Sequence, residues 1–165
     1  MISFKEYVNE IKSRFSDDFK PDIKKVNQNL VFDLCGKQIE FKPENEINSD
    51  GTPHFTYEEA IACQKDGWRL PTYLEFENLR RKYNYKFNKI AGEGIFEERL
   101  HLFADGFRRG NGEIDFVRTA GFYWTSTPVE GSRHSWYLYF NFGKVTDMNQ
   151  SKWRDGQSVR LVREV

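Results

Sequence analysis

Cysteine is the first thing that this sequence of 165 residues has little of. Its two cysteines, Cys35 and Cys63, allow one disulfide at most, form no CxxC pair and have no histidine at ligand spacing. A disulfide scaffold and a structural zinc site are therefore not indicated. Because a free cysteine behaves as a small apolar residue, we expect two reduced and largely buried thiols.

Long apolar runs are also missing. The mean hydropathy is −0.75, and no stretch approaches the roughly 18 apolar residues that a membrane-spanning helix needs. The first residues lack the uninterrupted apolar stretch of a signal peptide. We therefore expect no membrane insertion, and a location in the cytoplasm or in a phage virion.

A surplus of positive charge is the third absence. The 25 Lys and Arg residues are balanced by 25 Asp and Glu residues, and both signs are spread along the whole chain. Binding to nucleic acid through the release of counterions requires clustered basic residues. The charge balance therefore argues against a nucleic-acid partner.

Aromatic residues, in contrast, are abundant: 15 Phe, 8 Tyr and 4 Trp make up 16% of the chain. This content argues for a folded core and against disorder, and the length suits one domain. We expect the main domain at residues 51–165. Residues 1–50 should form an extension, a helix followed by a hairpin, that packs on it.

Three capping boxes, each a Ser or Thr followed three residues later by Glu, mark the starts of helices. The first, at Ser3, precedes apolar residues at helical spacing, namely Phe4, Tyr7, Val8, Ile11 and Phe15. The second, at Thr56, opens a helix that should end at Gly67. The third, at Thr72, opens a helix with a predicted buried stripe of Leu74, Phe76, Leu79 and Tyr83.

Alternating apolar residues bounded by turn residues predict the strands. Residues 30–34 and 38–41 flank a turn at Gly36 and indicate a hairpin. Further strands are expected at residues 122–126, 136–142, 144–148 and 158–163. Two stretches are expected to form loops, residues 43–53 by their composition and residues 84–121 by their many glycines.

The sequence contains no recognisable catalytic or metal-binding constellation. The three histidines, His54, His101 and His134, share no ligand spacing, and there is no GxSxG nucleophile motif. The paired carboxylates are neighbours in sequence, so they diverge on a helix. The default expectation is a protein that is not an enzyme, holds no metal and needs no cofactor.

Two segments are specific when they are taken together. The first is GWRLPT at residues 67–72, followed by Glu75 and Phe76. The second is GFYWTST at residues 121–127, followed after two predicted strands by GQSVRLV at residues 156–162. With a Gly-x-Arg element at 106–108, this order resembles the Fibrobacter succinogenes major paralogous domain and the C-terminal domain of Legionella collagen-like proteins. The resemblance covers about residues 55–165.

The resemblance implies an α+β, C-type-lectin-like fold, in which two helices pack on a twisted, mainly antiparallel sheet with long loops on one side. The N-terminal helix would be added to it. Trp68 and Trp124 would be core residues, and Arg69 would hold the loop region by hydrogen bonds. Calcium-dependent lectins carry a Glu-Pro-Asn or Gln-Pro-Asp loop and a Trp-Asn-Asp strand, and both are missing here. Ligand binding should therefore be independent of calcium.

Function is then expected in the loops and strand faces between these motifs. Residues 128–154 supply Tyr, Trp, Arg and Asn side chains, which recognition surfaces favour. The candidate ligand-binding residues are Arg133, His134, Tyr137, Tyr139, Asn141, Asp147, Asn149, Trp153 and Arg154. We expect them to bind an unknown protein or a surface glycan; an ordinary polar face is the alternative.

Other interpretations stay open. The C-terminal segment also resembles variable proteins of diversity-generating retroelements, which diversify such positions for ligand binding. An enzyme related to the formylglycine-generating group, which shares the general fold, is a second interpretation. It is disfavoured because that group's catalytic cysteine pair lies toward the C-terminus and no cysteine follows Cys63 here. A structural or assembly subunit of a phage or surface complex, docking through the N-terminal helix, is the third.

Overall fold

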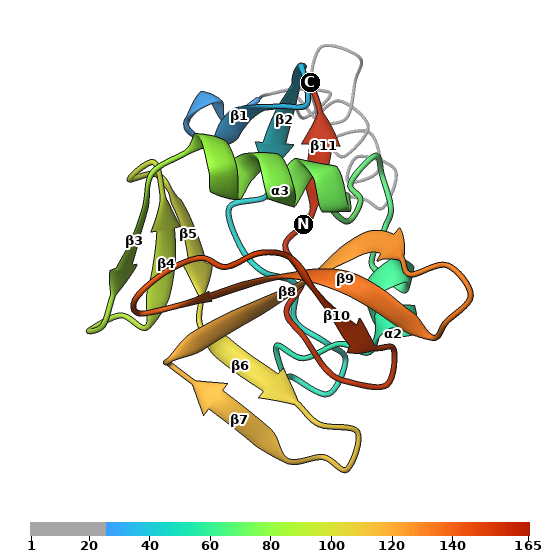
Figure 1. Ribbon diagram of the computed structural model, residues 1–165. Coiled ribbons are helices and arrows are strands. Elements are labelled where there is room, and N and C mark those ends of the chain that lie inside the picture. Colours follow the sequence, from blue (N-terminus) through green and yellow to red (C-terminus); the bar gives the residue numbers. More distant parts are fainter. Residues whose placement is uncertain (1–25) are drawn as a thin grey trace, which may run out of the picture.

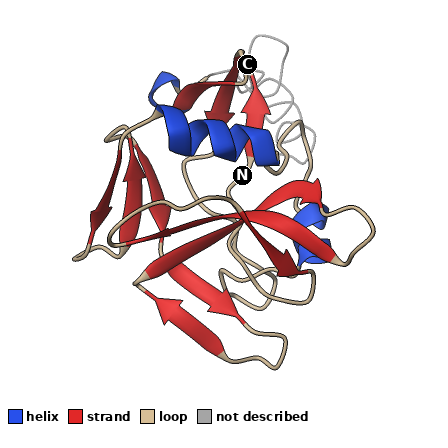
Figure 2. Cartoon of the chain, viewed as in Figure 1, coloured by secondary structure: helices blue, strands red, loops and turns tan. Residues whose placement is uncertain are grey.

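The computed structural model describes residues 26–165, which form an α+β structure of small antiparallel sheets and short helices (Figures 1 and 2). The helix predicted after Ser3 lies outside the described residues. One sheet has the strand order β1-β2-β11 and contains the predicted hairpin. Its members are β1 (Val31–Leu34), β2 (Lys37–Phe41) and β11 (Val162–Glu164), with η2 (Gln28–Leu30) preceding β1.

The central sheet has the strand order β10-β9-β8 and crosses the middle of the molecule (Figure 1). Its members are β8 (Ala120–Pro128), β9 (His134–Asn141) and β10 (Asn149–Lys152). The predictions for β8 and β9 are confirmed. The partner of β9 starts at Asn149, so the strand predicted at residues 144–148 is wrong. Those residues instead form the connection in which Val145 makes a single bridge to Phe140.

Both predicted capping boxes of the described chain are present. The Thr56 hydroxyl accepts the Glu59 N–H at 3.3 Å and starts α2 (Tyr57–Ala62), and the Thr72 hydroxyl accepts the Glu75 N–H at 3.1 Å and starts α3 (Tyr73–Lys82). The end predicted for the first of these helices is wrong. It stops at Ala62, because residues 65–68 form a tight turn in which Gly67 has a φ of +83°.

The buried stripe predicted for α3 is correct in part. Phe76 and Leu79 are buried, but Leu74 is 63% exposed. The buried side chain in the first turn is Glu75. It takes this place because Arg69 neutralises it: the two guanidinium nitrogens of Arg69 donate to the two Glu75 oxygens at 2.7 and 2.9 Å. Arg69 therefore ties the turn before α3 to the helix, as a bidentate ion pair with one buried partner.

The prediction of long loops at residues 84–121 is wrong. A meander, β3 (Tyr85–Asn88), β4 (Glu93–Phe96) and β5 (Leu100–Phe103), is followed by a hairpin, β6 (Asp105–Arg108) and β7 (Ile114–Val117). The glycines in these strands do not indicate loops; they occur where another part of the chain comes too close to leave room for a side chain. A Cβ atom on Gly94 would lie 2.7 Å from the Phe140 ring, and one on Gly106 would lie 1.9 Å from the Asp115 carbonyl oxygen.

The last strand is also shorter than predicted. Regular pairing starts only at Val162, whereas residues 156–161 make single bridges or isolated hydrogen bonds to several different segments. Gly156 bridges Arg108, and Ser158 bridges Tyr123 in parallel. All of residues 156–162 are buried. They form an extended segment that crosses the interior and contacts a different part of the chain at almost every residue.

Arg160 lies in the middle of this extended segment and is 2% exposed. Its guanidinium donates to the side chain of Asn45 at 2.8 Å, to the Lys42 carbonyl at 3.1 Å and to the His101 carbonyl at 2.9 Å. The Asn45 amide in turn donates to the Tyr123 hydroxyl at 2.8 Å. Burial lowers the pKa of Arg160. The buried guanidinium is tolerated because three acceptors, from the segment after β2 and from β5, satisfy its donors.

Two hydrophobic clusters lie on opposite faces of the central sheet. The first, towards α3, includes Tyr123, Leu138 and Phe140, and the second, towards α2, includes Tyr57 and Trp124. Successive residues of a strand point to opposite faces, which explains why Tyr123 and Trp124 belong to different clusters. Both faces of the sheet are therefore covered over part of their area.

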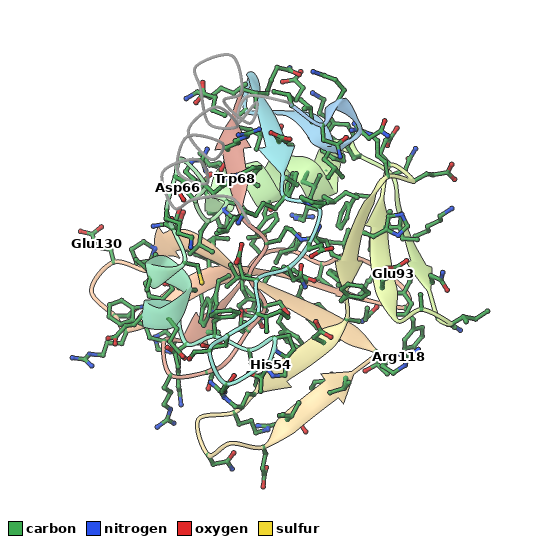
Figure 3. The ribbon with its side chains drawn as sticks, turned by 180° about the vertical axis from the view of Figure 1, so that it is seen from behind. His54, Asp66, Trp68, Glu93, Arg118 and Glu130 are labelled. Atoms are coloured by element: carbon green, nitrogen blue, oxygen red, sulfur yellow. The ribbon has the colours of Figure 1, made fainter. Side chains whose placement is uncertain are left out.

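Three sequence-based expectations about burial need correction. Cys35 and Cys63 are free, but Cys35 is exposed at the hairpin turn and Cys63 is only half-buried. Trp68 is also half-buried rather than in the core, and it lies beside β11 (Figure 3). The guanidinium carbon of Arg163 is 4.5 Å from its ring centre. Trp124, in contrast, is fully buried and donates its indole N–H to the Phe55 carbonyl at 2.8 Å.

We predict different costs for removing these two tryptophans. Trp124→Ala should lower the free energy of unfolding by about 3–5 kcal/mol, because it leaves a cavity in the second cluster. Trp68→Ala should cost only about 1 kcal/mol, since it removes a half-exposed stacking contact. Urea unfolding followed by far-UV circular dichroism measures both values. Equal losses in the two variants would contradict the half-buried position of Trp68 outside the core.

We expect Glu75 to make the stability of the protein depend on pH. Burial alone raises the pKa of Glu75, but hydrogen bonds from Arg69 and Thr72 outweigh it and hold the pKa below its usual value. A lowered folded-state pKa contributes stability above the unfolded pKa of about 4.3, and that stability is lost as the pH falls through the folded value. Glu75→Gln should therefore be less stable than the wild type by about 1–3 kcal/mol at pH 7.

The difference in unfolding free energy between the wild type and Glu75→Gln should narrow below about pH 4, where the wild-type carboxylate becomes protonated. Urea unfolding of both proteins at several pH values between 7 and 3 tests this. A gap of constant size across the series would show that the charge of Glu75 does not contribute.

Candidate ligand-binding surface

A groove with a volume of about 580 Å³ lies between the start of α2 and the ends of β9 and β10. We call it the Arg133–Arg154 groove. It brings together four of the candidate residues. Its lining consists of Thr56, Glu58, Arg133, His134, Lys152, Trp153 and Arg154.

The register of the central sheet builds this groove. Lys152 pairs with His134 across β10 and β9, and the Trp153 N–H continues the pairing by donating to the Arg133 carbonyl at 3.0 Å. On its other side, the Trp153 carbonyl accepts the Tyr57 N–H at 2.9 Å. The first turn of α2 is therefore held against the end of β10, as Figure 1 also shows.

Trp153 forms a fixed wall of the groove. Its ring stacks on Tyr57 at a centroid distance of 5.3 Å and an angle of 23°, and its indole N–H donates to the Ser135 hydroxyl at 3.1 Å. Tyr57 packs in turn on the buried Trp124. Because the indole is held by two neighbours, its exposed part is already in position for a ligand.

The charges of the groove are mainly positive. Arg133, Lys152 and Arg154 are exposed, and Glu58 is the one carboxylate in the lining. Arg154 also lies over the tip of the β6–β7 hairpin, since a Cβ atom on Gly110 would be 2.9 Å from its Cδ and Nε atoms. The cationic side chains thus reach from the central sheet towards both α2 and the hairpin.

A second, smaller hollow of about 310 Å³ adjoins the groove and shares His134 and Lys152 with it. It lies between the β6–β7 hairpin and the central sheet. Its other lining residues are Phe107, Arg109, Phe122, Tyr137, Gln150, Ser151, Asp155 and Gln157. The hollow contains one further candidate residue, Tyr137.

The two candidate tyrosines of β9 are half-buried and not fully open to solvent. Both pack on Phe122, with ring centroids 5.7 Å away for Tyr137 and 5.0 Å away for Tyr139. Burial raises the pKa of Tyr137. The predicted alternation itself is present, because Leu138 and Phe140 are buried on the other face.

Four candidate residues line neither hollow: Tyr139, described above, and the polar residues Asn141, Asp147 and Asn149. Asn141 caps the turn after β9, where its side-chain oxygen accepts the N–H groups of Gly143 and Lys144. Asp147 is exposed and accepts a hydrogen bond from Arg80 of α3 at 2.7 Å. Asn149, at the start of β10, accepts the Gln150 N–H at 2.8 Å. These side chains have local roles in turns or ion pairs.

Sequence reasoning missed the contribution of α2 to the groove. Thr56 was recognisable as a helix cap and Glu58 as a first-turn carboxylate, but nothing local places them beside residues 152–154. The hydrogen bond and the ring stacking between Tyr57 and Trp153 bring them there. Lys152, in contrast, lies within the stretch 128–154 that its composition had singled out.

Within residues 26–165, no three His, Cys, Asp or Glu side chains are grouped to hold a metal ion, and no helix is long and apolar enough to cross a membrane. No protein-family model matches the chain, and no curated protein or solved structure shows significant similarity to it.

We predict that calcium has no effect on stability or binding, because the lectin loop and strand motifs that supply calcium ligands are missing from the sequence. The melting temperature should be the same with millimolar calcium as with a chelator. A rise of several degrees on adding calcium, reversed by the chelator, would contradict this expectation.

Proposed function

We propose that this protein is a non-enzymatic, calcium-independent binding module that recognises a protein or a surface glycan through the Arg133–Arg154 groove. The observation that carries the proposal is the convergence of Arg133, His134, Trp153 and Arg154 in one groove. These residues come from the ends of two paired strands. The same stretch had been selected by its composition and by its place between the motifs.

The side chains of the groove suit recognition. Trp and Arg are enriched among the residues that carry most of the energy of protein interfaces. Trp153 is held by Tyr57 and Ser135, so it loses little conformational freedom when a ligand binds. Arg133 and Arg154 supply planar donors that can bind acceptor groups in pairs.

We further propose that the fold is C-type-lectin-like and that the chain is related to the paralogous-domain family. The α+β architecture is compatible with this, and two motif glycines have packing reasons that explain them. A Cβ atom on Gly121 would lie 2.1 Å from the Phe140 ring, and one on Gly156 would lie 3.0 Å from Arg108. A cytoplasmic or virion-associated location and the absence of a nucleic-acid partner remain part of the proposal.

The test is a binding screen with the purified protein against a glycan array and a random peptide library. We predict that the Arg133→Ala/Arg154→Ala variant keeps its stability within about 1 kcal/mol, because both side chains are exposed. Its affinity for the ligand found should fall by about 2 kcal/mol or more.

The matched control is Lys65→Ala/Lys144→Ala, which removes two exposed cations that do not line the groove. It should bind as the wild type does. A ligand that binds equally well to the arginine variant would overturn the assignment of function to the Arg133–Arg154 groove.

A further inference from the structure

We propose that the ligand of the Arg133–Arg154 groove is an acidic, extended peptide segment that pairs with the free edge of β10. Its carboxylates would lie against Arg133, Lys152 and Arg154. This inference rests on the proposed function and names the chemical class of the ligand. Three observations support it: unpaired cations, an open strand edge and the balance of charge in the groove.

The first observation concerns the arginines. Among residues 26–165, the side chains of Arg133 and Arg154 make no hydrogen bond or ion pair, and Lys152 between them makes none either. Every other arginine side chain in this part of the chain is engaged. Carboxylates bind Arg69, Arg80, Arg81, Arg108, Arg109 and Arg163, and backbone oxygens bind Arg99, Arg118 and Arg160.

This pairing pattern indicates what the two free guanidinium groups are suited to bind. The chain has as many acidic as basic residues, and among residues 26–165 carboxylates engage six of the nine arginines that have a partner. The planar guanidinium fork matches a carboxylate with two parallel hydrogen bonds. Two unpaired forks and an ammonium in one groove are therefore complementary to carboxylates that arrive from another molecule.

The second observation concerns the backbone of β10. The sheet order places β10 at an edge, with β9 on one side only. The Trp153 N–H points towards β9, because it donates to the Arg133 carbonyl. Backbone groups alternate in direction along a strand, so the Lys152 N–H and the Gln150 carbonyl point away from β9. The outward Gln150 N–H is bonded to the Asn149 side chain and the Lys152 carbonyl to the Asp155 N–H. The Lys152 N–H and the Gln150 carbonyl therefore offer one donor and one acceptor to an added strand.

The third observation favours a peptide over a sulfated glycan. Glu58 also lines the groove, and Asp155 lines the adjoining hollow. A densely charged polyanion would be repelled by both carboxylates, whereas a peptide can place its acidic side chains at intervals. Only a peptide can also pair with a strand edge through its own N–H and carbonyl groups.

The experiment uses a synthetic peptide in which Glu alternates with Thr, so that an extended conformation puts all its carboxylates on one face. Isothermal titration calorimetry with the full chain should detect binding that weakens as the salt concentration rises. The same peptide with Lys in place of Glu should not bind. The Glu peptide with alternate N-methylated residues keeps its charge but cannot pair with β10, and it should bind at least about tenfold more weakly.

Variants of the protein locate the site. Arg133→Glu/Arg154→Glu should weaken binding of the Glu peptide by about tenfold or more. Lys65→Glu/Lys144→Glu changes the net charge equally outside the groove and should keep most of the affinity. Circular dichroism confirms that each variant is folded. Shifts in the NMR signals of the β10 backbone amides on addition of the Glu peptide report strand pairing.

The outcomes separate this inference from the proposed function. Binding of a heparin oligosaccharide but not of the Glu peptide, lost in Arg133→Glu/Arg154→Glu, would overturn the acidic-peptide inference and leave the groove as a binding site. Undiminished binding of the N-methylated peptide would overturn strand pairing. No effect of the groove variant on any ligand would overturn both proposals.

Discussion

The buried guanidinium of Arg160 is the constraint on which the rest of the structure depends. It is satisfied by oxygens from the segment after β2 and from β5, and through Asn45 it is linked to Tyr123 of β8. A buried charge without these partners would cost several kcal/mol. The network therefore specifies how the first sheet, the meander and the central sheet come together around residues 156–161.

The central sheet then decides which surface is open. Its two faces carry separate hydrophobic clusters, so neither face of β9 is available over its whole length. The open regions are the free edge of β10 and the ends of β9 and β10, where α2 and the β6–β7 hairpin leave hollows. The proposed recognition would therefore take place at strand ends and edges, where cationic side chains surround a fixed indole ring.

Local sequence signals predicted the elements that local interactions stabilise. The capping boxes at Thr56 and Thr72, the hairpin at Gly36 and the strands β8 and β9 depend on residues close together in the chain, and the structure confirms them. The glycines of residues 84–121 were misread as loop markers. Gly94 and Gly106 serve close contacts with Phe140 and Asp115, which are distant in sequence or across a hairpin.

The candidate site, too, was predicted in part from local sequence and was completed by contacts between distant segments. The place of residues 128–154 between the motifs and their composition selected Arg133, His134, Trp153 and Arg154, because Trp and Arg are typical of recognition surfaces. Only the tertiary structure separated these residues from Asn141, Asp147 and Asn149, which serve turns and an ion pair. It also added Thr56 and Glu58 through the contact between α2 and Trp153. Local patterns determine elements and residue chemistry, whereas the faces that stay open depend on packing between segments far apart in the chain.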